Sequence, residues 1–304
     1  MAPEGLPKVL QEEIERIPEL KIEKCWDRLF LAIGPQKNLA FSQNTWLTPQ
    51  RFEISSISNA AKILRHHGKL WIPCSPQFHR RTSLIQEQLP KVKAEKFQYG
   101  QSLPTQPLGA WLLEDEKTLW LSEKTSSPFP NGEVPFVETK AAPSRAYLKL
   151  WEFFTLLGHS PKASDKCIDL GSSPGGWTWV LANLGCEVIS VDKAPLAPTL
   201  QDNKRIQSLK KDAFTLDPKT VGPVDWLFSD LICYPPKLYD LVEKWRDSGL
   251  VKNFVCTIKF QGKTDFESLD RFQAIPGSQI QHLSANKHEV TWSLLDKNPL
   301  NLMN

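Results

Sequence analysis

An acidic residue, a cluster of glycines and a second acidic residue follow one another in KCIDLGSSPGGWTWVLANLGCEVISVD, residues 166–192. Asp169 lies just before the first glycine, Gly171, and Asp192 follows that glycine by about 20 positions. Glycines let the backbone approach a ligand closely, and an acid at this distance can accept hydrogen bonds from a ribose diol. The spacing therefore predicts a nucleotide-type site at the edge of a parallel sheet.

The turn itself narrows the ligand that such a site would take. It is not G-x-G-x-x-G and it has no lysine for a triphosphate, which argues against dinucleotides and against a P-loop. Asp169 favours a ligand with a cationic part over one with a pyrophosphate. S-adenosylmethionine (SAM), with its sulfonium, ammonium and ribose, fits this description. The alternative is a βαβ unit with a tight turn and no ligand.

Further acids and a lysine stand at the ends of apolar runs downstream. Asp230 ends VDWLFSD and Lys259 ends NFVCTIK. The carboxyl ends of parallel strands meet at one edge, where ligand sites of α/β proteins form. Taken alone, each charge is better explained by a strand that leaves the core for solvent. Asp212 follows a third run, at a place where an acid often reaches the adenine amino group in SAM enzymes.

The motif DLGSSPGGW resembles the D-L-G-x-x-P-G-G-[WF] motif of FtsJ-like ribose 2′-O-methyltransferases. The upstream stretch VPFVETKAAPSRAYLKLWE, residues 134–152, is similar to the segment before the catalytic domain of the RlmM-type members. These methylate a cytidine ribose in 23S ribosomal RNA. The similarity extends over roughly residues 134–295.

The resemblance implies a Lys-Asp-Lys-Glu catalytic set, for which Lys149, Asp230, Lys259 and Glu289 fall at the matching places. Lys259 would take the proton of a ribose 2′-hydroxyl, and Lys149 would supply a second cation. A lysine can act as a base only if its pKa is lowered by burial or by a neighbouring cation. On sequence alone, Lys149 reads as a surface lysine. The residues expected to bind SAM are Asp169, Gly171, Ser173, Pro174, Gly175, Gly176, Trp177, Asp192, Asp212 and Asp230.

Short apolar runs alternate with helical patterns over residues 144–304, the expected methyltransferase catalytic domain. We expect strands at 167–170, 187–191, 206–209, 224–230 and 253–259, and a closing hairpin at 280–284 and 289–295. Helices are expected at 177–184, 238–248 and 266–272, with Ser144 as a candidate N-cap of the helix that carries Lys149. This order predicts an α/β protein with a Rossmann-like, doubly wound sheet and a terminal antiparallel hairpin.

Residues 1–125 predict a smaller α+β domain, and residues 126–143 lie in a Pro-, Ser- and Gly-containing stretch that is typical of a linker. A basic cluster with two aromatic residues in it could contact phosphates and stack a base of RNA. It consists of His66, His67, Lys69, Trp71, Phe78, His79, Arg80 and Arg81. The alternative is a solvated face beside core aromatics. Under the first interpretation this domain binds RNA, the expected partner.

Composition sets broader limits. The chain has 304 residues and a formal net charge of +3, which is compatible with RNA binding without indicating it. No apolar run approaches a membrane span, and the first 20 residues lack the apolar core of a signal peptide. The six scattered cysteines read as reduced residues of a cytoplasmic protein. The histidines lack Cys or acidic partners at metal-ligand spacing, so no metal is expected.

Two other functions stay open at this level. The chain could methylate another RNA, such as a tRNA or cap ribose, or it could be a non-catalytic SAM-fold scaffold that binds RNA. A scaffold would be free to lose the catalytic set, which is intact here.

Overall fold

The computed structural model describes residues 1–92 and 95–296. The chain divides into two compact units, with the boundary between Val137 and Glu138. We call them the N-terminal unit and the C-terminal unit. The backbone N–H of Val137 donates to Phe97 O at 2.9 Å, so the residues just before the boundary pack with the N-terminal unit. The boundary thus lies inside the segment that the sequence predicts as a linker.

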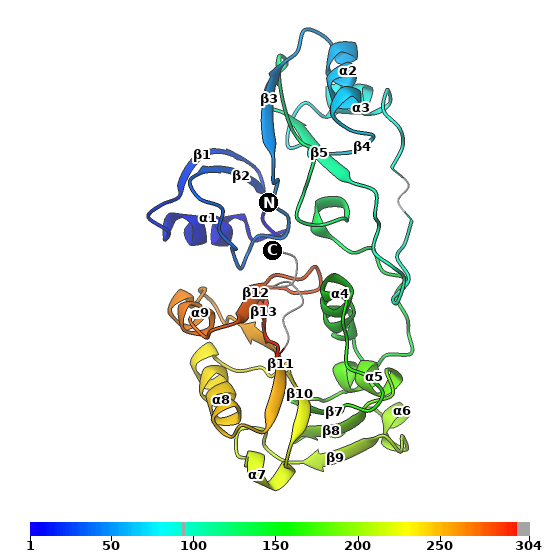
Figure 1. Cartoon of the computed structure of the whole chain (residues 1–304), viewed down its shortest axis with the longest axis vertical. Coiled ribbons are helices and arrows are strands. Elements are labelled where there is room, and N and C mark those ends of the chain that lie inside the picture. The colour runs from blue at the N-terminus through cyan, green and yellow to red at the C-terminus, as the bar shows by residue number, and fades with distance from the viewer. Residues whose placement is uncertain (93–94, 297–304) are drawn as a thin grey trace. The chain divides into compact units, whose positions relative to one another are not determined.

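The N-terminal unit contains two sheets (Figure 1). In the smaller one, β1 (Lys21–Trp26) and β2 (Leu29–Ile33) pair antiparallel beside α1 (Pro7–Glu15). The larger one has the order β3-β6-β5-β4, in which only β4 and β5 pair in parallel. Its strands and the two helices between them are β3 (Pro49–Glu53), α2 (Ile57–His67), β4 (Leu70–Pro73), α3 (His79–Gln86), β5 (Leu108–Leu113) and β6 (Thr118–Ser122). The unit has the expected α+β character.

A seven-stranded sheet in the order β12-β13-β11-β10-β7-β8-β9 forms the centre of the C-terminal unit. The five strands from β7 to β11 are parallel, whereas β13 runs antiparallel to both β11 and β12. The strands are β7 (Lys166–Leu170), β8 (Glu187–Asp192), β9 (Ile206–Lys210), β10 (Val224–Ser229), β11 (Val251–Lys259), β12 (Ser278–Gln281) and β13 (Glu289–Leu294). The predicted doubly wound sheet and its terminal hairpin are confirmed.

The strand order contains one reversal that matters for a ligand. From β7 the chain moves through β8 to the edge strand β9, and it then returns to the other side of β7 as β10 and β11. The carboxyl ends of β7 and β10 therefore diverge at a topological switch point, where α/β folds leave a crevice.

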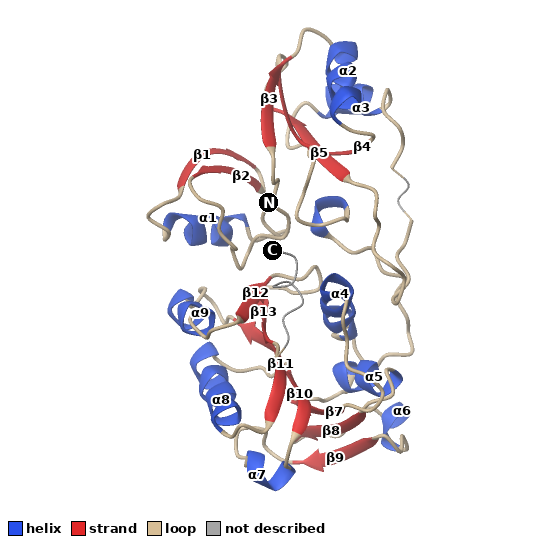
Figure 2. Cartoon of the chain, viewed as in Figure 1, coloured by secondary structure: helices blue, strands red, loops and turns tan. Residues whose placement is uncertain are grey.

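Helices cover both faces of this sheet (Figure 2). On one face α4 (Tyr147–Leu157) packs against α5 (Gly176–Asn183), and on the other α8 (Pro235–Asp247) packs against α9 (Phe266–Gln273). The short helices α6 (Pro198–Gln201) and α7 (Pro218–Val221) lie in the crossovers. The α4 helix begins at Tyr147 with Ala146 as its N-cap, so the expectation that Ser144 caps it is wrong.

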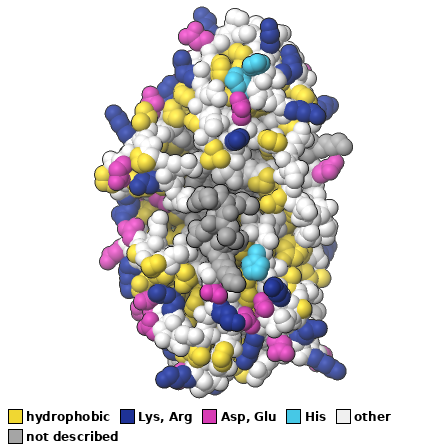
Figure 3. All heavy atoms as spheres, viewed as in Figure 1, with side chains coloured by type: hydrophobic (Ala, Val, Ile, Leu, Met, Phe, Trp, Pro, Cys, Tyr) yellow, Lys and Arg dark blue, Asp and Glu magenta, His cyan; other side chains and the backbone are white. Residues whose placement is uncertain are grey.

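The surface shows charges of both signs. On the face drawn in Figure 3, Lys and Arg side chains are interspersed with Asp and Glu side chains and form no continuous basic area. Across residues 1–92 and 95–296, no helix has the length and apolar character needed to cross a bilayer.

Candidate active site

A cavity of about 370 Å³ opens at the switch point of the C-terminal unit. Its wall is made by the turn after β7, by Asp192 at the end of β8, and by the residues that follow β10 and end β11. The lining residues are Ser144, Ala146, Asp169, Gly171, Ser172, Ser173, Pro174, Gly176, Trp177, Asp192, Asp230, Leu231, Ile232 and Lys259. Most of the residues predicted to bind SAM are therefore brought to one cavity.

The glycines of the turn are required by close contacts. Gly171 has φ of +79°, and a Cβ atom there would lie 2.4 Å from Leu231 Cδ2. A Cβ atom on Gly176 would lie 2.4 Å from Ser144 Oγ. A larger residue would be strained at the first position and would collide at both. The turn can therefore pass close to both the β10 loop and the segment before α4, which closes two sides of the cavity.

Asp192 holds the turn with the same carboxylate that faces the cavity. Its Oδ2 atom accepts a hydrogen bond from the Ser173 backbone N–H at 3.0 Å, and its Oδ1 atom accepts one from Ala194 N–H at 2.9 Å. Each carboxylate oxygen can accept a second bond. The side chain is therefore anchored and still has acceptor capacity for a diol.

Asp169 is the most buried acid of the site, with 1% of its surface exposed. Its Oδ2 atom accepts a hydrogen bond from Thr178 Oγ1 at 2.6 Å, whereas its Oδ1 atom has no hydrogen-bond partner within residues 1–92 and 95–296. Burial raises the pKa of Asp169 to about 7; the Thr178 hydrogen bond acts against this rise, and the charges of Asp230 and Asp192 add to it. A buried acceptor without a partner beside a cavity is a position at which a cationic or donor group of a ligand would be stabilised.

Behind Asp169 lie hydroxyl groups that the sequence analysis did not identify. Ser190 Oγ donates to Ser172 Oγ at 2.6 Å, and Thr178 reaches Ser190 at 3.5 Å as well as Asp169. The three side chains are buried. A signal for them was present: Thr178 falls in the first turn after the glycines, and Ser190 interrupts the apolar run of β8.

The four residues of the expected catalytic set converge. Lys149 Nζ lies 3.0 Å from Asp230 Oδ1 and 2.6 Å from Glu289 Oε1. Lys259 Nζ lies 3.0 Å from the same Oδ1 atom of Asp230 and donates to the Asp230 backbone oxygen at 2.6 Å. Helix α4, the end of β10, the end of β11 and the start of β13 each supply one residue. The pairing of Lys259 with Glu289 in the β11–β13 ladder brings these two backbones together.

The two lysines differ in their surroundings. Lys149 is 7% exposed and lies between two carboxylates. Burial acts to lower its pKa, but Asp230 and Glu289 outweigh burial, so the pKa of Lys149 is raised above the ordinary value for lysine. Lys259 contacts only one of these carboxylates and lines the cavity. Lys149 is thus held as a cation, and Lys259 is the lysine that a ligand in the cavity can reach.

A second buried charge on α4 fixes the loop before Glu289. Glu152 is 2% exposed, and both oxygens of its carboxylate accept from the Ser284 backbone N–H, at 2.8 and 2.9 Å. The Ser284 hydroxyl also donates to Oε1 at 2.8 Å. The sequence analysis missed Glu152, although a charge three residues after Lys149 in an apolar helix falls on the same helix face.

Not every expected residue lines the cavity. Asp212 is absent from its wall: the carboxylate pairs with Lys193 Nζ at 2.7 Å and accepts from Phe214 N–H at 3.0 Å. Its role toward an adenine stays a prediction. Gly175 lies in the turn without lining the cavity. In the part of the chain that the structure describes, no three His, Cys, Asp or Glu residues are grouped so that they could hold a metal ion.

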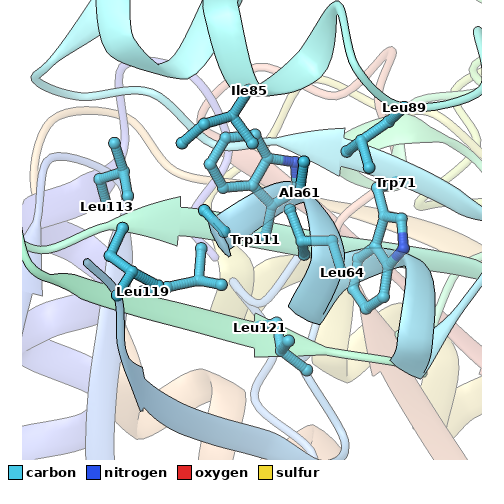
Figure 4. Packing of buried hydrophobic residues seen from close by; sticks show 11 residues of the cluster. Ala61, Leu64, Trp71, Ile85, Leu89, Trp111, Leu113, Leu119 and Leu121 are labelled. Atoms are coloured by element: carbon cyan, nitrogen blue, oxygen red, sulfur yellow. The ribbon is translucent and has the colours of Figure 1, made fainter. Parts of the chain in front are cut away.

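The aromatic side chains of the basic cluster in the N-terminal unit are too buried to form a stacking surface. Trp71 is wholly buried in the core that α2 and α3 form over the larger sheet (Figure 4), and its Nε1 atom donates to Gly68 O at 3.0 Å. Phe78 is partly buried against the same core. The suggestion that Trp71 stacks a base is therefore wrong, because its ring faces are covered by protein. Lys69 and Arg80 are exposed.

The region around the cavity is similar to a known protein family. Residues 142–265 match the model of the FtsJ-like methyltransferase family. These residues form an FtsJ-like methyltransferase domain. The match includes every residue that lines the cavity, together with Lys149. Glu289 and the N-terminal unit lie outside it.

Several relatives of this chain bear the same name. A protein of Aromatoleum aromaticum called ribosomal RNA large subunit methyltransferase M is 30% identical over 199 residues, which are 59% of this chain and 54% of that protein. The protein of the same name from Pseudomonas putida is 34% identical over 163 residues, or 50% and 46% of the two chains. The chain thus spans about half the length of the curated relatives it matches.

Among solved structures, the Methanococcus jannaschii fibrillarin pre-rRNA processing protein is similar, with a TM-score of 0.39, 16% identity, and coverage of 60% of this chain and 80% of that one. At this level the likeness carries no weight for function. The fold assignment depends on the strand order and on the family match.

Proposed function

We propose that the protein is a SAM-dependent ribose 2′-O-methyltransferase that acts on RNA of the large ribosomal subunit. The observation that carries the proposal is the mutual contact of Lys149, Asp230, Lys259 and Glu289, of which Asp230 and Lys259 line a cavity whose other wall is the glycine turn and Asp192. A cofactor site and a set of groups suited to deprotonating a hydroxyl then share one cavity.

The cavity suits SAM in its chemistry. The free acceptor of Asp169 and the negative charges nearby would favour a sulfonium and an ammonium group. Asp192 would accept hydrogen bonds from the ribose diol. The turn from Gly171 to Trp177 would let the ligand approach the backbone. SAM, when bound, supplies an activated methyl group to a nucleophile.

Lys259 is the proposed base, because it lines the cavity while Lys149 is held as a cation between two carboxylates. Lys259 would take the proton of the 2′-hydroxyl as the oxygen attacks. The positive charge of Lys149 would stabilise the oxygen as it becomes negative. Asp230 contacts both lysines and would set the distance between them.

Ribosomal RNA is the proposed substrate because the relatives of the FtsJ-like domain are named for it. The proposed site of action is therefore the cytoplasm. A tRNA or cap ribose is the alternative substrate, and a scaffold without activity is the alternative function. The scaffold is disfavoured because the four charged residues are both present and in contact.

The test is a map of 2′-O-methylated nucleotides in total RNA from cells with and without the protein, and with the Lys259→Ala variant in place of it. The proposal expects one large-subunit rRNA position to lose its methyl group in both altered strains. Loss of a 2′-O-methyl group from a tRNA position instead would show that tRNA is the substrate. Identical maps in all three strains would support the scaffold and end the proposal.

A further inference from the structure

The loop that follows β10 exposes two large apolar side chains beside the catalytic set. Ile232 is 82% exposed and Tyr234 is 62% exposed. Among the described residues of the C-terminal unit, no other large hydrophobic side chain is so exposed. Exposed apolar side chains that gather at one place of an otherwise polar surface mark a binding site more often than isolated ones do.

The loop is held in place by the residues that alternate with these two. Leu231 packs so closely on Gly171 that a Cβ atom there would meet it at 2.4 Å. Cys233 is 8% exposed, and α8 begins directly after Tyr234 with two prolines, Pro235 and Pro236. Residues 231 and 233 therefore pack toward the protein, while the side chains of residues 232 and 234 are exposed.

The position of the loop restricts what it can contact. Leu231 and Ile232 line the same cavity as Asp230 and Lys259. In a nucleotide, the carbon that bears the 2′-hydroxyl is bonded to the carbon that bears the base. If the hydroxyl reaches Lys259, the base of the same nucleotide must lie next to the mouth of the cavity. A base offers a flat π-face, for which an aromatic ring is the preferred partner.

We propose that Tyr234 stacks on the base of the nucleotide whose ribose is methylated, and that Ile232 contacts its edge or its sugar through apolar surface. The inference rests on the proposed function, since it takes the reacting group to be a ribose hydroxyl. Stacking of this kind orients the nucleotide and adds affinity, but it discriminates little between the four bases. Tyr234 and Ile232 are then positioning residues for the reaction.

The test measures methyl transfer from labelled SAM to large-subunit rRNA, or to large-subunit particles, from cells that lack the protein, whichever the wild type methylates. Tyr234→Ala and Tyr234→Leu should each raise KM for the RNA by about 5- to 150-fold, the range that corresponds to ~1–3 kcal/mol of stacking. Tyr234→Phe, which keeps the ring, should stay within twofold of the wild type. Ile232→Ala should raise KM by a smaller factor. The melting temperature should stay unchanged in all four, and SAM affinity should stay unchanged in the three Tyr234 variants, because Tyr234 does not line the cavity.

The matched control is Ile33→Ala, which removes an exposed side chain (58%) from the N-terminal unit and should leave KM unchanged. If Tyr234→Leu retains the wild-type KM, the loop binds by apolar contact alone, as a protein partner would use it, and stacking is overturned. If the wild type is active and all the variants match it, the inference fails and the proposed function stands. If the wild type methylates no RNA, both fall together.

Discussion

Two lysines share the carboxylate of Asp230, and at the scale of single residues their neighbours separate their roles. Burial acts to lower the pKa of Lys149, but Asp230 and a second carboxylate, Glu289 at 2.6 Å, together raise the pKa and keep this lysine charged. Lys259 has no such second partner among the described ion pairs and faces the cavity. The site therefore combines a permanent cation with a lysine that a hydroxyl can approach.

Replacing Lys259 with alanine should reduce kcat by about 10²–10⁴-fold, the usual contribution of a general base, because no other proton acceptor of this type lines the described cavity. SAM affinity, measured by calorimetry, should change little. Lys219→Ala is the matched control, because it removes the charge of an exposed lysine on α7. It should leave kcat unchanged. A wild-type rate in purified Lys259→Ala would remove Lys259 from the reaction.

Asp192→Ala should weaken SAM binding by about 1.5–3 kcal/mol, the scale of hydrogen bonds to a charged group. The loop bonds from Ser173 and Ala194 are lost as well, so circular dichroism must show that the variant is folded. Asp202→Ala removes an exposed acid from the same unit and serves as the control. Equal SAM affinity of the folded Asp192→Ala protein and the wild type would exclude Asp192 from the ligand site.

Asp169 should make the stability of the SAM-free protein depend on pH. Its folded pKa of about 7 is above the value of about 3.9 for an unfolded chain, so the folded state holds the proton more tightly. Its contribution to stability therefore falls as the pH rises from about 4 through 7 and levels off above about 8. Between pH 6 and pH 8 the free energy of unfolding should fall by ~1 kcal/mol relative to Asp169→Asn. Parallel pH profiles of the two proteins in urea titrations would contradict the assignment.

At the scale of elements, the site is assembled where strand ends and one helix meet. The carboxyl ends of β7, β8, β10 and β11 supply the turn, Asp192, Asp230 and Lys259, as parallel pairing requires. Helix α4 adds Lys149, and Glu152 on the same helix holds the loop that leads into β13 and Glu289. Helix α4 therefore supplies Lys149 itself and, one turn later, Glu152, which holds the loop that positions Glu289.

Glu152→Gln should lower the free energy of unfolding by about 1–3 kcal/mol, because an amide cannot accept from Ser284 with both of its terminal atoms. Ser284→Ala removes only the hydroxyl and should cost less. Since the two residues are in contact, the double variant should lose less than the sum of the single losses. Additive losses in denaturant titrations would mean that the two side chains do not stabilise one another.

At the scale of the whole molecule, the question is whether the N-terminal unit binds RNA. Its basic side chains favour this function, whereas its tryptophan does not. Its exposed lysine and arginine side chains are available for phosphates, whereas Trp71 belongs to the core and offers no ring face. Phosphate contacts position an RNA without reading its sequence. We therefore propose that this unit binds RNA through charge, and that base contacts come from elsewhere in the chain.

Changing Lys69 and Arg80 together to alanine should weaken RNA binding and flatten its salt dependence. Each lost phosphate contact reduces the slope by about 0.7 logarithmic units per decade of salt for single strands. Lys8→Ala with Lys21→Ala removes two exposed charges from the same unit and is the matched control. If the two double variants have the same slope, or if neither differs from the wild type, the cluster at Lys69 and Arg80 has no specific part in RNA binding. SAM affinity should be equal in all three proteins.

Local sequence was enough to determine the elements and the class of the site. Apolar runs broken by glycine and charge predict β7, α5 and β8, because strand and helix periods depend on nearest neighbours along the chain. Asp169, Gly171 and Asp192 lie within one such unit, so their relation could be read from spacing alone. The family motif added Lys149, Lys259 and Glu289 as candidates, but spacing could not place them together.

Tertiary structure decided the contacts between segments that are far apart in the chain. Lys149 and Asp230 are 81 residues apart, and Glu152 and Ser284 are 132 apart. No periodicity reports such pairs, because they arise when a helix packs on a sheet. The same reason explains the error about Trp71. Its basic neighbours in the sequence indicate a binding surface, whereas in the folded chain Trp71 belongs to a hydrophobic core. Whether a charge faces solvent, a partner or a cavity is settled by packing.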